Sequence, residues 1–98
     1  MKAKQIIKFL GFKCILEKGQ YPNGRIALEL VEVNTGEPVL VASINMTNEY
    51  LSEDEVIIKN YSENEGILDI LIKAQIISEP TRYVYSGWTT SPVCKLLK

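Results

Sequence analysis

The sequence contains no histidine, the commonest general base and the commonest metal ligand in proteins. Ser-His and Cys-His nucleophile pairs are therefore excluded. The two cysteines, Cys14 and Cys94, match no metal-ligand spacing, and we expect both to be reduced and buried. The glycine patterns GxGxxG and GxxxxGK, which bind phosphates, are also missing. We expect no cofactor and no metal.

Long apolar runs are missing as well, and no segment approaches the roughly twenty apolar residues of a membrane span. The start, MKAKQIIKFLGFKCIL, imitates a secretion signal, but Lys8 and Lys13 interrupt it and no small-residue cleavage site follows. We expect a strand here and a cytoplasmic protein. Ninety-eight residues, 46% of them hydrophobic and 23% charged, predict a single domain over residues 1–98.

Charge is nearly balanced overall, at −1, but it is unevenly distributed. Five of the eleven basic residues lie in the first eighteen positions, whereas residues 49–69 hold seven of the twelve acids and one lysine. The near-zero sum provides no general attraction to nucleic acid or to an anionic membrane. We interpret the acidic segment as a solvated loop and helix start, with attraction of a basic partner as the alternative.

The clearest helix signal lies within residues 57–77. Ser62 and Glu65 fit the S-x-x-E capping box, in which each side chain accepts a hydrogen bond from the other residue's amide. A stripe with helical spacing follows at Ile67, Ile70, Leu71 and Ala74. The pattern predicts a helix at about residues 62–76, which Pro80 prevents from continuing.

Alternating polarity predicts three strands joined as an antiparallel meander, at residues 12–16, 25–33 and 39–46, with turns at 21–24 and 34–38. Leu40, Ala42, Ile44 and Met46 are expected to form one apolar face of the third strand. Short extended pieces are expected at residues 56–59, 82–86 and 93–97. The predicted fold class is α+β: an antiparallel sheet of five to six strands with one helix (about 62–76) packed on one face.

Polar residues around the predicted helix start and one tryptophan are the candidate binding residues: Asn60, Tyr61, Glu63, Asn64 and Trp88. Capping accounts for Ser62 and Glu65 and partly for Glu63, and it leaves Asn60, Tyr61 and Asn64 unexplained. Trp88 lies in a turn-like segment, and exposed aromatic residues on loops are typical binding anchors. The alternative is that Trp88 packs against the edge of the core.

Two other functions are open. A carboxylate-dependent hydrolase would be favoured by a concave pocket that unites Glu63 or Glu65 with Tyr61 and another polar group, and disfavoured by a flat or convex surface there. A nucleic-acid-binding surface would use the N-terminal lysines and two aromatic residues: Lys2, Lys4, Lys8, Lys13 and Lys18 with Phe9 and Phe12. Lysines on an edge strand also protect it from pairing with other chains, which is the simpler explanation.

Three segments carry a resemblance to a known family: GRIALELVEVNTGEPVLVASINM, IIKNYSENEGILDILIKAQII and SGWTTSPVCKLL. They resemble uncharacterised small proteins of bacterial genomes, plasmids and phages, of the domain-of-unknown-function 4313 type. The resemblance implies a shared fold and a phage or mobile-element setting, without an established activity. From the helix-start residues and the Trp88 segment we expect a non-enzymatic protein-binding module, and the phage or mobile-element setting makes a host protein its expected partner. A homodimer is open, since a terminal strand can pair across a two-fold axis.

Overall fold

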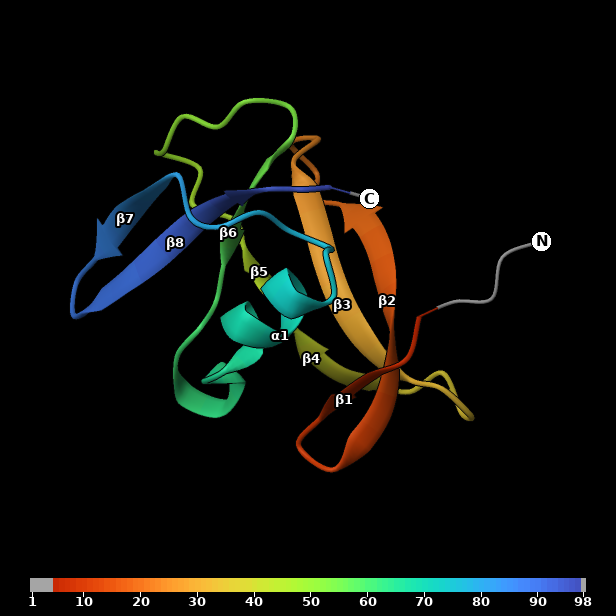
Figure 1. The fold of residues 1–98 in the computed structure, drawn as a ribbon. Coiled ribbons are helices and arrows are strands. Elements are labelled where there is room, and N and C mark those ends of the chain that lie inside the picture. Colours follow the sequence, from red (N-terminus) through yellow and green to blue (C-terminus); the bar gives the residue numbers. More distant parts are fainter. Residues whose placement is uncertain (1–4, 98) are drawn as a thin grey trace.

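The structure is a computed structural model that describes residues 5–97, and these residues form two antiparallel sheets of four strands each (Figure 1). The first sheet has the order β1-β2-β3-β4: Ile7–Phe9, Phe12–Gln20, Ile26–Glu32 and Pro38–Val41. The second has the order β5-β6-β8-β7: Ser43–Ile44, Glu55–Ile58, Thr89–Lys95 and Arg82–Ser86. The α+β class and the antiparallel meander β2-β3-β4 are confirmed, but the single sheet of five to six strands is wrong.

The chain passes from the first sheet to the second at Ala42, the single residue between β4 and β5. The Ala42 amide donates to the Leu28 carbonyl of β3 at 2.8 Å, and the Ala42 carbonyl accepts from the Lys59 amide at 2.8 Å. One residue thus carries a bond to each sheet. The predicted strand 39–46 is divided here because its two halves pair with different neighbours.

Ser43 completes this crossing with its side chain. Ser43 is 4% exposed, and its hydroxyl accepts a hydrogen bond from the Leu28 amide at 2.9 Å. The side chain thus supplies the acceptor for this amide at the point where the chain leaves the first sheet. The Tyr21 hydroxyl lies 2.9 Å from the same oxygen. A buried amide without an acceptor is costly, so the serine hydroxyl stabilises the crossing.

The helix is shorter than predicted and starts differently. A 3-10 turn at Ser62–Asn64 precedes α1, which spans Ile67–Lys73. No side-chain cap bond comes from Ser62, whose φ is 56°, so the predicted capping box is wrong. Asn60 caps α1 instead, because its Oδ1 accepts from the amides of Gly66 at 3.1 Å and Leu68 at 3.0 Å. Gly66 joins turn and helix at a φ of 96°, which glycine adopts without steric cost.

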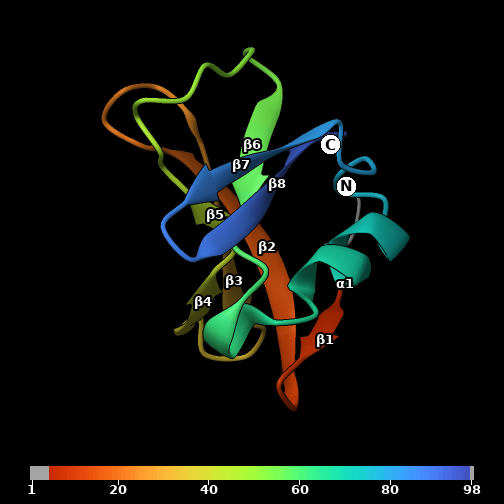
Figure 2. The same cartoon turned by 90° about the vertical axis from the view of Figure 1, so that its left-hand side faces the viewer.

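The main core lies between the two sheets and α1, which both views place between β1 and β8 (Figures 1 and 2). It contains Leu28 and Leu30 from β3, Ile67 and Leu71 from α1, and both cysteines, which are free and buried. The helix therefore covers the apolar face of the sheets, as its residue spacing predicts. Within residues 5–97, no helix is long and apolar enough to span a membrane.

A second apolar cluster lies on the opposite face of the second sheet, around Ile57 and Val93. The segment 45–54 covers it with Met46 and Leu51. Two arginines hold this segment in place. Arg25 donates to the Met46 carbonyl at 2.7 Å and to the Glu49 carbonyl, and Arg82 donates to the Tyr50 carbonyl.

Candidate functional site

The two asparagines of the predicted site have structural roles. Asn60 caps α1, as described above. Asn64 is only 1% exposed, and its Nδ2 donates to the Val41 carbonyl of β4 at 2.8 Å. This bond ties the 3-10 turn to the edge of the first sheet. Asn64 is buried and the Asn60 amide oxygen accepts from two backbone amides, which leaves the half-buried Tyr61 and the exposed Glu63 as the other predicted contacts at the helix start.

Lys59 brings Tyr61 and Glu63 together. Its Nζ lies 2.6 Å from Glu63 Oε1 and 5.6 Å from the centroid of the Tyr61 ring. The hydrogen bond from Lys59 lowers the pKa of the Glu63 carboxyl, with a smaller effect from a backbone hydrogen bond. The same bond to Glu63 raises the pKa of Lys59. Both groups are therefore ionised at neutral pH and largely neutralise each other.

A hollow of about 500 Å³ lies beside this group, between the 3-10 turn and the chain crossing. Its polar lining consists of Tyr21, Ser43, Asn45, Lys59, Tyr61, Glu63 and Asn64. The hollow unites Tyr61 with Glu63, an arrangement that the hydrolase hypothesis predicts, whereas Glu65 is not in its wall. The lowered pKa of Glu63 disfavours this carboxyl group as a proton donor at neutral pH.

Trp88 is 103% exposed, so its indole does not pack against the core edge. It forms the two-residue turn between β7 and β8 together with Gly87, whose φ is 57°. The Thr89 hydroxyl donates to the Ser86 carbonyl at 2.9 Å and closes the turn. Five residue pairs join β7 to β8 below it. The backbone that carries the indole is thus part of an ordered hairpin rather than of a loose loop.

Two tyrosines extend the exposed aromatic surface down the hairpin. Tyr83 is 53% exposed and Tyr85 is 74% exposed, and their spacing of two residues puts both on one face of β7. Neither tyrosine belongs to the binding residues predicted from the sequence. The alternation Arg-Tyr-Val-Tyr-Ser was the available signal, but the sequence left open whether the tyrosine face or the Val84 face is covered.

The helix-start hollow and the hairpin are neighbours through Asn45. A second hollow, of about 340 Å³, is lined by residues 45–49 with Tyr85 and Ser86. Asn45 lies in the wall of both hollows. Asn45 therefore borders both the hollow at Tyr61 and the hollow at the hairpin that carries Trp88.

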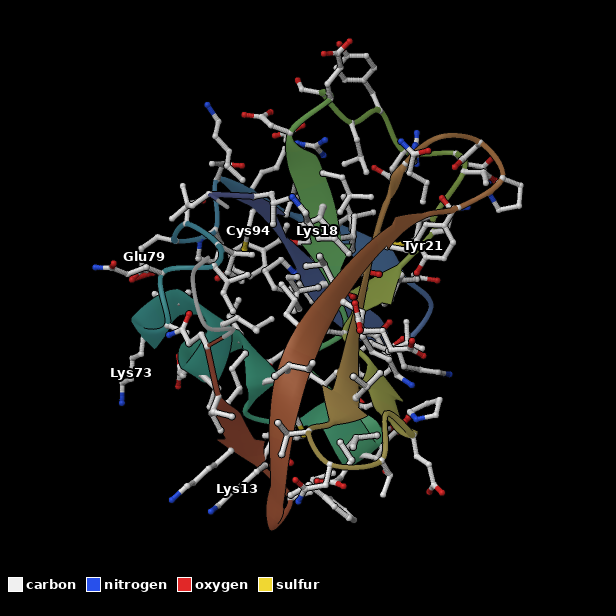
Figure 3. All side chains as sticks on the ribbon, turned by 90° about the vertical axis from the view of Figure 1, so that its right-hand side faces the viewer. Lys13, Lys18, Tyr21, Lys73, Glu79 and Cys94 are labelled. Atoms are coloured by element: carbon white, nitrogen blue, oxygen red, sulfur yellow. The ribbon has the colours of Figure 1, made fainter. Side chains whose placement is uncertain are left out.

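The N-terminal lysines do not form one stripe. Lys8 and Lys13 face each other across β1 and β2, whereas Lys18 lies an odd number of residues from Lys13 and so on the other face of β2. Figure 3 shows Lys13 and Lys18 at separate heights along the strand. Phe9 is buried and cannot stack on a base without leaving the core. Lys2 and Lys4 lie outside the described residues.

The two thiols are poor nucleophiles. Burial, with a smaller effect from the charge of Glu79, raises the pKa of Cys94 to about 12. Burial also raises the pKa of Cys14, and the charge of Glu32 adds to it. Neither thiol forms a reactive thiolate at neutral pH.

Comparisons of the chain with protein-family models, with curated proteins and with solved structures find no match. The resemblance to the domain-of-unknown-function 4313 type therefore stays a prediction.

Proposed function

We propose that this chain is a non-enzymatic protein-binding module that uses Trp88 as its anchor. The fully exposed indole at the tip of the β7–β8 hairpin is the observation that supports the proposal most directly. Tryptophan is among the residues that contribute most to binding when a partner buries them. We propose Tyr61 and Glu63, in the wall of the larger hollow that Asn45 also borders, as secondary contacts.

The hairpin suits this use because it fixes the backbone position of Trp88 before a partner arrives. An anchor that is already positioned loses less conformational entropy on binding than one on a loose loop. Burial of an aromatic side chain removes roughly 150–250 Å² from water, at about 25 cal/mol per Å². The gain is on the order of 4–6 kcal/mol, and because association costs about 4–15 kcal/mol, Trp88 would act together with further contacts.

The partner that we propose is a host protein, with this chain as a phage or mobile-element accessory. The resemblance of the three segments quoted above is the support for that setting. The Lys59–Glu63 pair supplies one exposed carboxylate and one ammonium group, so the secondary contact suits a polar partner surface.

The test uses the fact that Trp88 is the only tryptophan. Proteins captured from host lysate by the wild-type chain, and not by Trp88→Ala, are purified and titrated into the wild-type chain. Partners without tryptophan, or labelled with a non-fluorescent analogue, keep the signal specific. We expect a blue shift of Trp88 emission, saturation, and protection from a soluble quencher.

Tyr50→Ala is the matched control, because Tyr50 is also exposed but lies outside the hairpin. It should bind like the wild type, while Glu63→Ala should weaken binding less than Trp88→Ala. Circular dichroism checks that each variant is folded. Binding that is unchanged in Trp88→Ala, or a complex in which the indole stays open to the quencher, would overturn the proposal.

A further inference from the structure

The two sheets have four edge strands, and three of them carry features that discourage pairing with another chain. The edge strand β1 has three residues and an exposed lysine, Lys8. The edge strand β4 begins with Pro38, and Asn64 occupies its Val41 carbonyl. The edge strand β5 has two residues. Short strands, lysine, proline and side-chain caps are the usual protection of sheet edges.

The fourth edge strand, β7, has none of these features. It is five residues long, with the sequence Arg-Tyr-Val-Tyr-Ser. Its one charged residue, Arg82, donates to the Tyr50 carbonyl and lies 3.8 Å from the Glu55 carboxylate, so it is engaged within the molecule. Figure 2 shows β7 along the side of the molecule that is turned to the viewer.

The hydrogen-bond pattern shows which backbone groups β7 presents at its free edge. The Val93 carbonyl accepts from the amide and the hydroxyl of Thr81, so this carbonyl points from β8 toward β7. Val93 is opposite Arg82, and the bonding direction alternates along a strand. Arg82, Val84 and Ser86 therefore direct their backbone groups to β8, while Tyr83 and Tyr85 direct theirs outward.

We infer that β7 pairs with β7 of a second copy of this chain, antiparallel, across a two-fold axis at Val84. In this register Tyr83 lies opposite the partner's Tyr85, and Tyr85 lies opposite the partner's Tyr83. Both members of each pair present outward-facing backbone groups, and such a pair exchanges two hydrogen bonds. The edge is thus self-complementary, as an interface with two-fold symmetry requires.

The side chains fit the same register. Each tyrosine of one copy faces a tyrosine of the other on the same side of the joined sheet, and cross-strand aromatic pairs stabilise sheets. Arg82 is placed opposite the partner's Ser86, so like charges do not face each other along β7. The joined sheet has eight strands, formed from the four-stranded second sheet of each copy.

This inference does not depend on the proposed use of Trp88. The turn at Gly87 and Trp88 lies beyond the paired residues at each end of the joined strands. A dimer of this kind presents two Trp88 side chains, one from each copy. If the Trp88 proposal also holds, the dimer engages its partner at two sites.

The test replaces the two tyrosines by charged residues in two patterns and measures association by sedimentation equilibrium. The wild-type chain should show a monomer–dimer equilibrium. The variant Y83K/Y85K puts lysine opposite lysine in both pairs and should dimerise about tenfold or more weakly. The variant Y83K/Y85E puts lysine opposite glutamate in both pairs, and should recover most of the lost affinity. Circular dichroism confirms folding of both variants, whose substitutions are at exposed positions.

Amide hydrogen exchange supplies a second measurement. The amides of Tyr83 and Tyr85 should exchange more slowly as protein concentration rises, because dimerisation occupies them, while the amides of Arg82 and Val84 should not change. A wild-type chain that stays monomeric at millimolar concentration would overturn the inference. Equal association of the two charge variants would also overturn it, and so would an open-ended series of oligomers or a dimer without protection of Tyr83 and Tyr85.

Discussion

The Ser43 hydroxyl accepts a hydrogen bond from the Leu28 amide at 2.9 Å, at the point where the chain leaves one sheet for the other. The bond replaces a strand-to-strand bond that the crossing removes. Because this bond satisfies a buried amide at the crossing, the Ser43 side chain stabilises the two-sheet architecture.

Replacing Ser43 by alanine should therefore destabilise the protein. The Leu28 amide would be left without an acceptor in a buried site, and we expect a loss of about 1–3 kcal/mol in the free energy of unfolding. Chemical denaturation measures it. Tyr21→Phe is the control, since it removes the Tyr21–Ser43 bond and keeps the acceptor for Leu28. An equal loss in the two variants would contradict the role assigned to the Leu28 bond.

The helix cap can be tested by comparing two alanine variants. Asn60→Ala removes the acceptor for the Gly66 and Leu68 amides and should cost about 0.5–2 kcal/mol. Ser62→Ala removes no side-chain cap and should stay within about 0.5 kcal/mol of the wild type. Thermal unfolding distinguishes the two. The reverse order would support the capping box and contradict the observed cap.

The Lys59–Glu63 pair predicts the pH behaviour of one carboxyl group. The pKa of Glu63 should lie below its ordinary value of 4.5, because the Lys59 hydrogen bond favours the charged form. A lowered pKa means that the pair stabilises the fold above pH 4.5, and that this contribution is lost as the pH falls through the folded value. The exposure of both groups keeps the effect on stability small.

Carboxyl-resolved NMR titration measures the Glu63 pKa directly. In Lys59→Met it should return toward 4.5, whereas Lys73→Met, which removes a lysine at the end of α1, should leave it unchanged. A wild-type value at or above 4.5 would show that the pair does not persist in solution.

The buried thiols should be unreactive until the protein unfolds. With its pKa raised to about 12, Cys94 should react with a thiol reagent at pH 8 far more slowly in the native protein than in denaturant. Stability should also fall as the pH rises from 9.0 toward 12, because the unfolded chain releases the thiol proton while the folded chain keeps it. Cys94→Ala, compared with the wild type, should reduce that fall. Rapid native labelling at Cys94 would contradict the burial.

Local patterns in the sequence were sufficient for several parts of the fold. The turn at residues 21–24 follows from its Pro-Asn-Gly residues, and the Tyr21 carbonyl accepts from the Gly24 amide there at 2.8 Å. The helical spacing from Ile67 onward identified α1, and Ile67 and Leu71 are buried as that spacing predicts. These features depend on residues within a few positions of one another, which is why they can be read from the sequence.

The apolar residues 40–46 show what the sequence could not determine. Leu40 and Ala42 belong to the main core, whereas Ile44 and Met46 pack against the second cluster on the other face of the second sheet. The alternation is the same for one continuous strand as for two short strands in different sheets. The strand is divided at Ala42 because Ala42 bonds to the Leu28 carbonyl on one side and to the Lys59 amide on the other, and both partners are distant in sequence.

For the candidate site, too, local sequence and tertiary contacts determined different things. The sequence by itself determined which residue types were available: no histidine, two separated cysteines, one tryptophan and a polar group before the helix. Tertiary structure decided that Asn60 and Asn64 bond inward, that Glu63 pairs with Lys59, and that Trp88 is exposed. The physical reason is that residue type sets which bonds a side chain can form, whereas burial and long-range partners decide which of them it does form.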